Sequence, residues 1–481
     1  MQFNSVVFLK FFAAFLLLYH LVRGHRGARN WLVVVGSYTF YGWWDYRFLA
    51  LLLASSLLDY AVGLRLEATS AAPARRRWVM LSLAGNLGIL GVFKYCGFFV
   101  DSLAEVLTAL GFRADLPTLH LVLPVGISFY TFQTLSYTLD VYRRQMVATR
   151  DLGAFLAYVS FFPQLVAGPI ERASALLPQF MQPRVITRSH LEEGGWLVLW
   201  GLFKKVVVAD NLAPLVEMAF EHPTPSGPLV VLGTVAFGFQ IYADFSGYSD
   251  LARGLARLLG FELRWNFRLP YGAGNVREFW RRWHISLSTW LRDYLYISLG
   301  GNRRGPARTR LNLLLTMVLG GLWHGAAWHF VAWGLWHGLG LLGHRLWESS
   351  RPRRTVLAVP DGHGAGWKPA PPWSGLGWLL TIAFVFYGWL LFRAPSLGHA
   401  WVMTKALSDW SSPVWLGSYG ISLVAFAAPL VAMQVWQARR GDLLVALTLP
   451  GWGRALLQGA LLVGVLLFWE KGVTPFIYFQ F

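Results

Sequence analysis

The 481-residue sequence contains a single cysteine, Cys96, and only 24 acidic residues against 42 lysines and arginines. One cysteine excludes an internal disulfide framework and any metal site built from several thiolates. The sequence also lacks the Gly-x-Ser-x-Gly nucleophile elbow, the His-Glu-x-x-His zinc helix and the phosphate-binding P-loop. An acyl-enzyme on serine or cysteine is therefore not expected. Segments that alternate apolar and polar residues, as in outer-membrane barrels, are absent as well.

Long apolar runs are what the sequence does contain, and 55% of its residues are hydrophobic. A run of about 20 apolar residues crosses a ~30 Å hydrocarbon core as one helix. The sequence therefore predicts an all-α polytopic membrane protein with roughly 11–13 transmembrane or re-entrant helices around a central cavity. The predicted apolar segments are 5–22, 31–44, 48–64, 79–95, 121–139, 152–170, 195–219, 228–243, 311–326, 331–347, 376–392, 418–437 and 455–469.

Basic clusters between these segments order the chain. Residues 1–150 are predicted to form N-terminal transmembrane helices, and 151–347 a catalytic core whose proline- and glycine-broken runs indicate re-entrant pieces. A cytoplasmic Pro/Gly-rich loop is expected at 348–375, and residues 376–481 supply C-terminal helices and an aromatic tail. Because loops rich in Lys and Arg stay in the cytoplasm, we expect a retained first helix and an N-terminus on the outside.

The region 251–310 departs from the membrane pattern, with 12 arginines against three acidic residues. Its run 278–294 is typical of an amphipathic helix at the cytoplasmic face. In a soluble protein this charge would indicate nucleic acid, but basic clusters between apolar runs are better explained by topology and anionic lipid. Two interpretations stay open. The arginines anchor the chain in lipid, or Arg281 and Arg282 belong to a cationic surface that binds phosphate, in which case charge reversal weakens donor affinity more than folding.

His324 lies in the run 320–329, inside a segment of membrane length. An ionisable side chain at such depth is costly and is a functional candidate, because lipid supplies no hydrogen-bond partner. His324 is about 14 residues from Arg310, or about 20 Å along a helix. Segments 311–326 and 331–347 are predicted to form a hairpin, in which Gly321 and Gly325 let another helix backbone come close. Two other interpretations are a histidine buried for packing alone and a metal site; the latter would use His324, His329, His337 and His344.

A second polar cluster, 240–250, ends the segment 228–243. Asp244, Ser246 and Tyr248 are candidates for orienting a substrate or for pairing with arginine. The alternative interpretation is a solvated helix end at which Asp250 faces Arg253. For His324, flanked by Trp323 and Trp328, the chemistry is more definite: burial keeps an imidazole neutral and able to accept a proton from an incoming hydroxyl.

Several motifs together resemble the membrane-bound O-acyltransferase family, and the resemblance covers nearly the whole chain. Within that family the sequence is similar to the branch that acetylates exopolysaccharide, alginate above all, more than to the D-alanyl transfer branch. The motifs are Phe161-Phe162-Pro163-Gln164, Ala167-Gly168-Pro169-Ile170, Asp-Phe-Ser-Gly-Tyr-Ser-Asp at 244–250, Arg-Glu-Phe-Trp-Arg-Arg-Trp-His-Ile-Ser at 277–286, Trp323-His324-Gly325 and the terminal Phe-Ile-Tyr-Phe-Gln-Phe.

The resemblance implies a funnel-shaped bundle in the bacterial inner (cytoplasmic) membrane, where a cytoplasmic donor and an extracytoplasmic acceptor meet. It places the family's essential histidine on His324 and the second histidine of its signature region on His284. It also implies acetyl-coenzyme A as the donor substrate, no permanently bound cofactor or metal, and a periplasmic partner that passes acetyl groups to a polysaccharide. Trp323, Trp328, Asp244, Ser246, Tyr248, Arg281 and Arg282 are the predicted substrate-binding residues.

Two further classes of protein compete with an enzyme. Helices broken by proline and glycine, with polar groups inside the membrane, also suit a transporter or flippase of a lipid-linked intermediate, although no inverted repeat is evident. A non-catalytic scaffold of a polysaccharide export complex is the third hypothesis. These predict, respectively, substrate movement without an acyl donor and acetylation that no point mutation removes.

Overall fold

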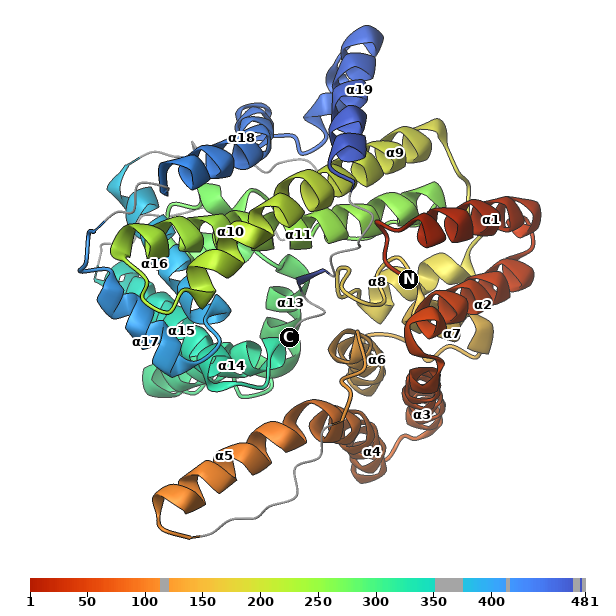
Figure 1. Ribbon diagram of the computed structural model, residues 1–481. Helices are drawn as coiled ribbons and strands as arrows, with labels where there is room; N and C mark the ends of the chain where they lie inside the picture. Colours follow the sequence, from red (N-terminus) through yellow and green to blue (C-terminus); the bar gives the residue numbers. More distant parts are fainter. Residues whose placement is uncertain (113–120, 351–374, 412–415, 470–475, 478–481) are drawn as a thin grey trace. The chain divides into compact units, whose positions relative to one another are not determined.

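The computed structural model describes the chain except for residues 113–120, 351–374, 412–415, 470–475 and 478–481 (Figure 1). The predicted loop at 348–375 and the aromatic tail therefore lie largely outside the described residues. Within the described part every regular element is a helix, which confirms the all-α prediction. Five helical stretches there are long and apolar enough to cross a membrane: Arg26–Ala68, Ala72–Ala109, Gly227–Leu258, Leu376–Arg393 and Leu416–Arg440.

The described chain forms two compact units. The first comprises Met1–Leu202, Gly247–Trp265 and the described part of Trp469–Phe481. Its helices are α1 (Val6–Val22), α2 (Arg26–Asp45), α3 (Leu49–Ala68), α4 (Ala72–Leu90), α5 (Cys96–Ala109), α6 (Ile127–Tyr142), α7 (Leu152–Ser160), α8 (Ala173–Met181), nearly all of α9 (Arg188–Phe203) and the end of α11, joined in places by the short helices η1 (Tyr46–Phe48) and η2 (Gly91–Tyr95).

A buried polar network joins α3 and α4 in the first unit. Asp59 is fully buried and accepts hydrogen bonds from Ser82 Oγ (2.5 Å) and Asn86 Nδ2 (2.9 Å). Ser55 Oγ donates to Asn86 Oδ1 at 2.6 Å. Because lipid offers no partners, such groups are retained inside a bundle only when neighbouring helices satisfy them. The network therefore fixes how these two helices pack.

The second unit comprises Phe203–Ser246 and Asn266–Phe468. Its helices are η3 (Lys204–Ala209), α10 (Asp210–Glu221), the first part of α11 (Gly227–Leu258), η4 (Pro270–Gly272), α12 (Val276–Arg282), α13 (Ile285–Trp290), η5 (Leu291–Tyr296), α14 (Gly305–His324), α15 (Trp328–Ser349), α16 (Leu376–Arg393), α17 (Leu397–Ala406), α18 (Leu416–Arg440), η6 (Val445–Thr448) and α19 (Gly451–Leu467).

Three elements differ from the sequence prediction. Helix α11 does not end near 243 but continues to Leu258, so residues 244–250 are buried inside a helix and form no solvated helix end. Helices α5 and α17 lie in stretches where no segment was predicted. In α5 no residue is buried, and Phe99 and Leu103 on it are more than half exposed.

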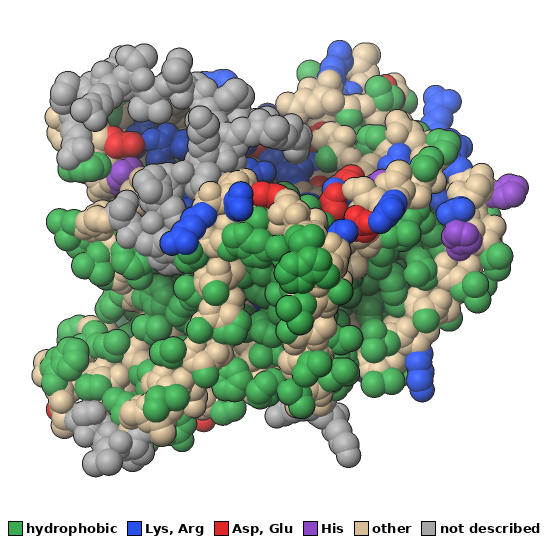
Figure 2. Space-filling model, turned by 90° about the horizontal axis from the view of Figure 1, so that it is seen from above, with side chains coloured by type: hydrophobic (Ala, Val, Ile, Leu, Met, Phe, Trp, Pro, Cys, Tyr) green, Lys and Arg blue, Asp and Glu red, His purple; other side chains and the backbone are tan. Residues whose placement is uncertain are grey.

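The surface carries many large hydrophobic side chains. Leu17, Leu21, Trp43, Leu456 and Leu467 are each more than 60% exposed, and Figure 2 shows hydrophobic side chains over much of the face it presents. Soluble proteins rarely expose contiguous apolar patches of more than a few hundred Å². Lipid is the environment in which such a surface costs nothing, in agreement with the membrane-length helices.

Helices α14 and α15 form the predicted hairpin, and glycines set their separation. A Cβ placed on Gly321 would overlap the Phe330 carbonyl oxygen and lie 3.1 Å from the Gly334 Cα. A Cβ on Gly334 would in turn overlap the Met317 carbonyl. The two backbones are therefore in direct contact one turn before His324, which confirms the close approach predicted at Gly321.

Replacing Gly321 with valine should open this hairpin. The new side chain has no space against the backbone of α15, so we expect the free energy of unfolding to fall by at least about 2 kcal/mol. Thermal unfolding of the purified protein would measure this. Gly343→Ala is the matched control, because Gly343 also lies in α15 but has open space around it. A Gly321→Val variant as stable as the control would contradict the argument.

Candidate active site

His324 is the last residue of α14 and is 5% exposed. The helix stops there because Gly325 is extended, and α15 begins again at Trp328. Aromatic rings enclose the imidazole: Trp323 at 5.0 Å between ring centroids, Trp333 at 5.1 Å and Phe392 at 5.4 Å. The histidine predicted from sequence as a base is thus held in a buried, aromatic environment.

The structure brings the second predicted histidine, His284, next to the first. Their ring centroids are 6.3 Å apart, although 40 positions separate them in sequence. His284 connects α12 to α13 and is completely buried. Its ring also contacts Phe245 at 4.6 Å and Trp323 at 5.9 Å. The two imidazoles therefore share one aromatic surrounding within the second unit.

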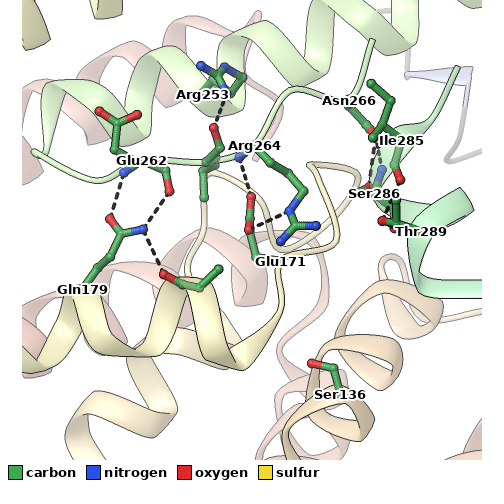
Figure 3. A network of polar contacts seen from close by, with 12 residues as sticks. Ser136, Glu171, Gln179, Arg253, Glu262, Arg264, Asn266, Ile285, Ser286 and Thr289 are labelled. Carbon is green, nitrogen blue, oxygen red and sulfur yellow. Dashed lines mark hydrogen bonds and ion pairs between the residues drawn. The ribbon is translucent and has the colours of Figure 1, made fainter. Parts of the chain in front are cut away.

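Asn266 determines the orientation of His284. Asn266 Oδ1 lies 3.2 Å from His284 Nδ1. The other bonds of Asn266 are drawn in Figure 3: Oδ1 accepts hydrogen bonds from Ser286 N (3.2 Å) and Ser286 Oγ (3.0 Å), and the backbone oxygen accepts from Ile285 N at 2.9 Å. An amide oxygen only accepts, so Nδ1 of His284 carries the proton toward it. The other nitrogen, Nε2, is then the basic one.

The backbone at His284 confirms that this position is over-determined. Its φ of 43° is left-handed, a conformation that is uncommon for residues other than glycine. Such strain persists only where surrounding contacts impose it, and it is concentrated at functional sites. His284 lies outside the helices long enough to span a membrane, and burial lowers its pKa to about 3. The ring is therefore neutral at physiological pH, and its unprotonated nitrogen can accept a hydrogen bond.

The polar cluster in α11 binds two lysines of the short helix η3. Asp244 Oδ1 lies 2.8 Å from Lys205 Nζ, which also pairs with Asp210 at 2.8 Å. Lys204 Nζ donates to Ser246 Oγ at 2.9 Å. Both lysines are buried, so these carboxylate and hydroxyl groups compensate charges in the core. The sequence analysis considered arginine as the partner of this cluster, but Asp244 pairs with a lysine.

Tyr248 belongs to the first unit. Its ring contacts Phe3 at 4.8 Å and Phe476 at 4.7 Å between centroids. The described residues of the terminal segment thus pack against Tyr248 of the 244–250 motif within that unit.

The two tryptophans predicted to bind substrate have different environments. Trp323 is 4% exposed and touches both histidines, whereas Trp328 is 50% exposed at the start of α15.

The arginines of 251–310 have different environments. In the first unit Arg264 pairs with the buried Glu171 at 3.2 Å, and Arg253 donates to the Leu263 carbonyl, so both hold loops together (Figure 3). In the second unit Arg282 is 4% exposed and bound to Glu278. Arg281, beside it, is exposed. Charge reversal at Arg282 would place a carboxylate next to Glu278. For this residue we therefore expect the change to weaken folding as well as donor affinity.

Asn266, Lys204 and Lys205 were missed in the sequence prediction. No local signal marks Asn266, because its partners lie 18 and 20 positions further along the chain. The two adjacent lysines in an apolar segment were a signal: buried cations require carboxylate or hydroxyl partners, and the polar cluster at 244–250 supplies both. In the described part of the chain, no three or more His, Cys, Asp or Glu residues gather in a way that could hold a metal ion.

Comparison with known proteins identifies the family to which the chain belongs. A model of the membrane-bound O-acyltransferase family matches residues 117–353, which include both histidines. A protein named probable alginate O-acetylase AlgI, from Azotobacter vinelandii, is 44% identical over 416 residues, covering 85% of this chain and 79% of that protein. The chain therefore belongs to the membrane-bound O-acyltransferase family, and it is a multi-pass membrane enzyme.

Two other relatives show the range of the family. The peptidoglycan O-acetyltransferase of Helicobacter pylori is 35% identical over 420 residues, covering 82% of this chain and 74% of that protein. A teichoic acid D-alanyltransferase from Streptococcus thermophilus is 29% identical over 333 residues, covering 64% and 78%. Similarity to the acetyl-transferring relatives thus extends further along the chain than similarity to the D-alanyl-transferring one.

Removing the Asn266 side chain should disturb the site without touching a histidine. Asn266→Ala leaves three buried donors without their acceptor, and we expect a loss of about 3 kcal/mol in the free energy of unfolding. Asn266→Asp keeps an acceptor oxygen and should recover most of that loss. Thermal unfolding measures the stability, and ¹⁵N chemical shifts of the His284 ring report its tautomer. An alanine variant with unchanged stability and tautomer would show that Asn266 does not orient His284.

Proposed function

We propose that this protein transfers an acetyl group from acetyl-coenzyme A, supplied on the cytoplasmic side of a bacterial inner membrane, to a hydroxyl group destined for an exopolysaccharide. The observation that carries the proposal is the juxtaposition of His324 and His284 in one buried aromatic surrounding. Two adjacent imidazoles, the second oriented by Asn266, are suited to proton transfer at an acyl centre. Family membership supports acyl transfer as the reaction.

The reaction needs no acyl-enzyme. His324 accepts the proton of the attacking hydroxyl while the hydroxyl oxygen forms a bond to the thioester carbonyl carbon. The carbon–sulfur bond then breaks, and the proton passes to the departing thiolate, so an ester and a free thiol result. His284 stands close enough to hydrogen-bond a reacting group through Nε2. Exclusion of water by the surrounding rings protects the thioester from hydrolysis.

Exposed arginines support a phosphate-bearing donor. Arg281 is the exposed member of the Arg281–Arg282 pair, and Arg303, Arg304, Arg308 and Arg310 are exposed between η5 and the first turns of α14. Arginine forks bind phosphate oxygens in pairs, and coenzyme A carries three phosphate groups. A cationic surface also raises the local concentration of such a ligand. Lipid anchoring remains the competing use of these side chains.

Alginate is the acceptor polymer that the relatives support best. The Azotobacter relative is named an alginate O-acetylase and matches most of this chain. We further propose a periplasmic partner that takes the acetyl group onward to the polymer. Transfer of D-alanine to a cell-wall polymer is the alternative within the family, supported by the Streptococcus relative at lower identity.

Replacing His324 with alanine tests the central claim. A general base contributes about 10²–10⁴-fold to a rate, so acetylation of the polymer should fall at least about 100-fold while the amount of protein in the membrane stays near wild type. His344→Ala is the control: His344 lies on the same hairpin but binds Glu348 at 3.3 Å. Acetylation that persists in the His324→Ala strain would remove this residue from the mechanism.

A transporter or flippase would behave differently from an acyltransferase. Purified protein reconstituted in lipid vesicles should release free thiol from acetyl-coenzyme A only when an acceptor hydroxyl is present. A transporter would move its substrate across the vesicle membrane with no donor and release no thiol. A scaffold would do neither, and every point variant that still assembled would leave acetylation in cells unchanged.

Arg281→Glu should weaken donor binding. Loss of one charge-assisted contact corresponds to about tenfold in affinity or more, and the difference should shrink as salt is raised. Arg439→Glu is a control of equal charge change at an exposed position at the end of α18. The donor's KM in the thiol-release assay measures the effect. If Arg281→Glu and Arg439→Glu bind the donor equally well, the Arg281 contact is refuted and lipid anchoring is favoured.

A further inference from the structure

Three ring side chains of the second unit lie beside one another, two of them buried and one half-buried, with ring nitrogens that no described residue satisfies. They are Trp280 in α12 and Trp333 and His337 in α15, called the ring trio below. Their centroids are 5.0, 5.1 and 5.7 Å apart. The indole nitrogens of both tryptophans and both ring nitrogens of His337 have no hydrogen-bond partner among the described residues. Trp333 is 1% exposed and His337 is fully buried.

Such a concentration of unsatisfied groups is unusual for packing alone. Buried polar atoms nearly always have a partner, and each exception requires an explanation. Two other tryptophans of this unit obey the rule: Trp336 Nε1 donates to the Phe384 carbonyl at 3.0 Å, and Trp378 Nε1 to the Tyr271 carbonyl at 2.9 Å. Apolar side chains packed at these two positions would avoid this cost. The polar atoms of the ring trio therefore point to a ligand that arrives from elsewhere.

The position of the ring trio identifies which part of a ligand would meet it. Trp280 directly precedes the exposed Arg281 on α12. At the other end, Trp333 contacts His324 at 5.1 Å. The trio thus connects the helix that carries the phosphate-binding candidate with the imidazole at which acyl transfer is proposed. Between the phosphates and the thioester, coenzyme A has an arm with two amide groups, whose carbonyl oxygens accept hydrogen bonds from N–H donors.

We propose that Trp280, Trp333 and His337 bind the carbonyl oxygens along the amide-bearing arm of the acyl donor and so position its thioester at His324. This inference rests on the proposed function, because it names where that donor lies. The indole N–H groups donate to carbonyl oxygens, and His337 donates through one ring nitrogen and accepts an amide N–H through the other. The trio is a binding and positioning element, distinct from the base.

Binding measurements with two probes test the assignment on the whole purified protein. The first probe is acetyl-coenzyme A, and the second is adenosine 3′,5′-bisphosphate, which has phosphates but no amide arm. Trp280→Phe, Trp333→Phe and His337→Leu should each weaken acetyl-coenzyme A binding about tenfold, the value of one neutral hydrogen bond. Binding of the bisphosphate should stay unchanged. The melting temperature of the two Trp→Phe variants should fall less than that of Trp336→Phe, because they lose the same ring volume but no hydrogen bond within the described structure.

Trp336→Phe is the matched control. It makes the same change one residue before His337 but removes an indole that is already paired. We expect a lower melting temperature and unchanged affinity for both probes. Unchanged acetyl-coenzyme A affinity in all three trio variants would overturn the proposal and leave the groups to bound water. Equal weakening of both probes would also overturn it, because the effect would then not concern the arm. Wild-type protein that binds no acetyl-coenzyme A would instead refute the proposed function itself.

Discussion

The hydrogen bonds that converge on the Asn266 side-chain oxygen are the constraint on which the candidate site depends. They hold His284 and Ser286 to one atom and so maintain a left-handed backbone at His284 that the chain would otherwise avoid. The turn separates α12 from α13 and directs the His284 ring toward His324. Without this oxygen, the buried imidazole would lose the bond that fixes its orientation, and burial of a polar group without such a bond is costly.

Charge in this protein follows the same rule of local compensation. Arginines that are buried or close a loop have a partner, as Arg282 has Glu278 and Arg264 has Glu171. Buried lysines are treated likewise, since Lys205 lies between two aspartates. The positively charged side chains of the sequence therefore fall into two groups, those paired inside the units and those exposed on the surface. The first group is neutralised by partners within each unit. The second group, which includes Arg281, is available to lipid or to a phosphate-bearing ligand.

The sequence predicted the features that follow from composition and from the length of apolar runs. It did not predict features that depend on contacts between residues far apart in the chain. Apolar runs of membrane length predicted helices, and paired glycines predicted the close hairpin of α14 and α15. His324 stood out because an ionisable residue in such a run is costly. The predicted end of α11 was wrong. Polar residues such as Asp244 and Ser246 indicate the end of an apolar helix, and the sequence does not show that buried lysines face them. Asn266 could not be found at all, since nothing near it in sequence shows that it meets His284.

Polar groups of the second unit thus divide by whether the fold satisfies them. Asp244, Ser246 and the Trp336 indole are bound by neighbours, and their role is accounted for by packing and charge compensation. His337 and Trp333 are equally buried but are satisfied by no described neighbour. Folding selects against such groups, so their presence next to His324 requires a benefit that the unliganded fold does not realise. A substrate that supplies the missing partners provides that benefit, and it places donor recognition on the same hairpin as the proposed base.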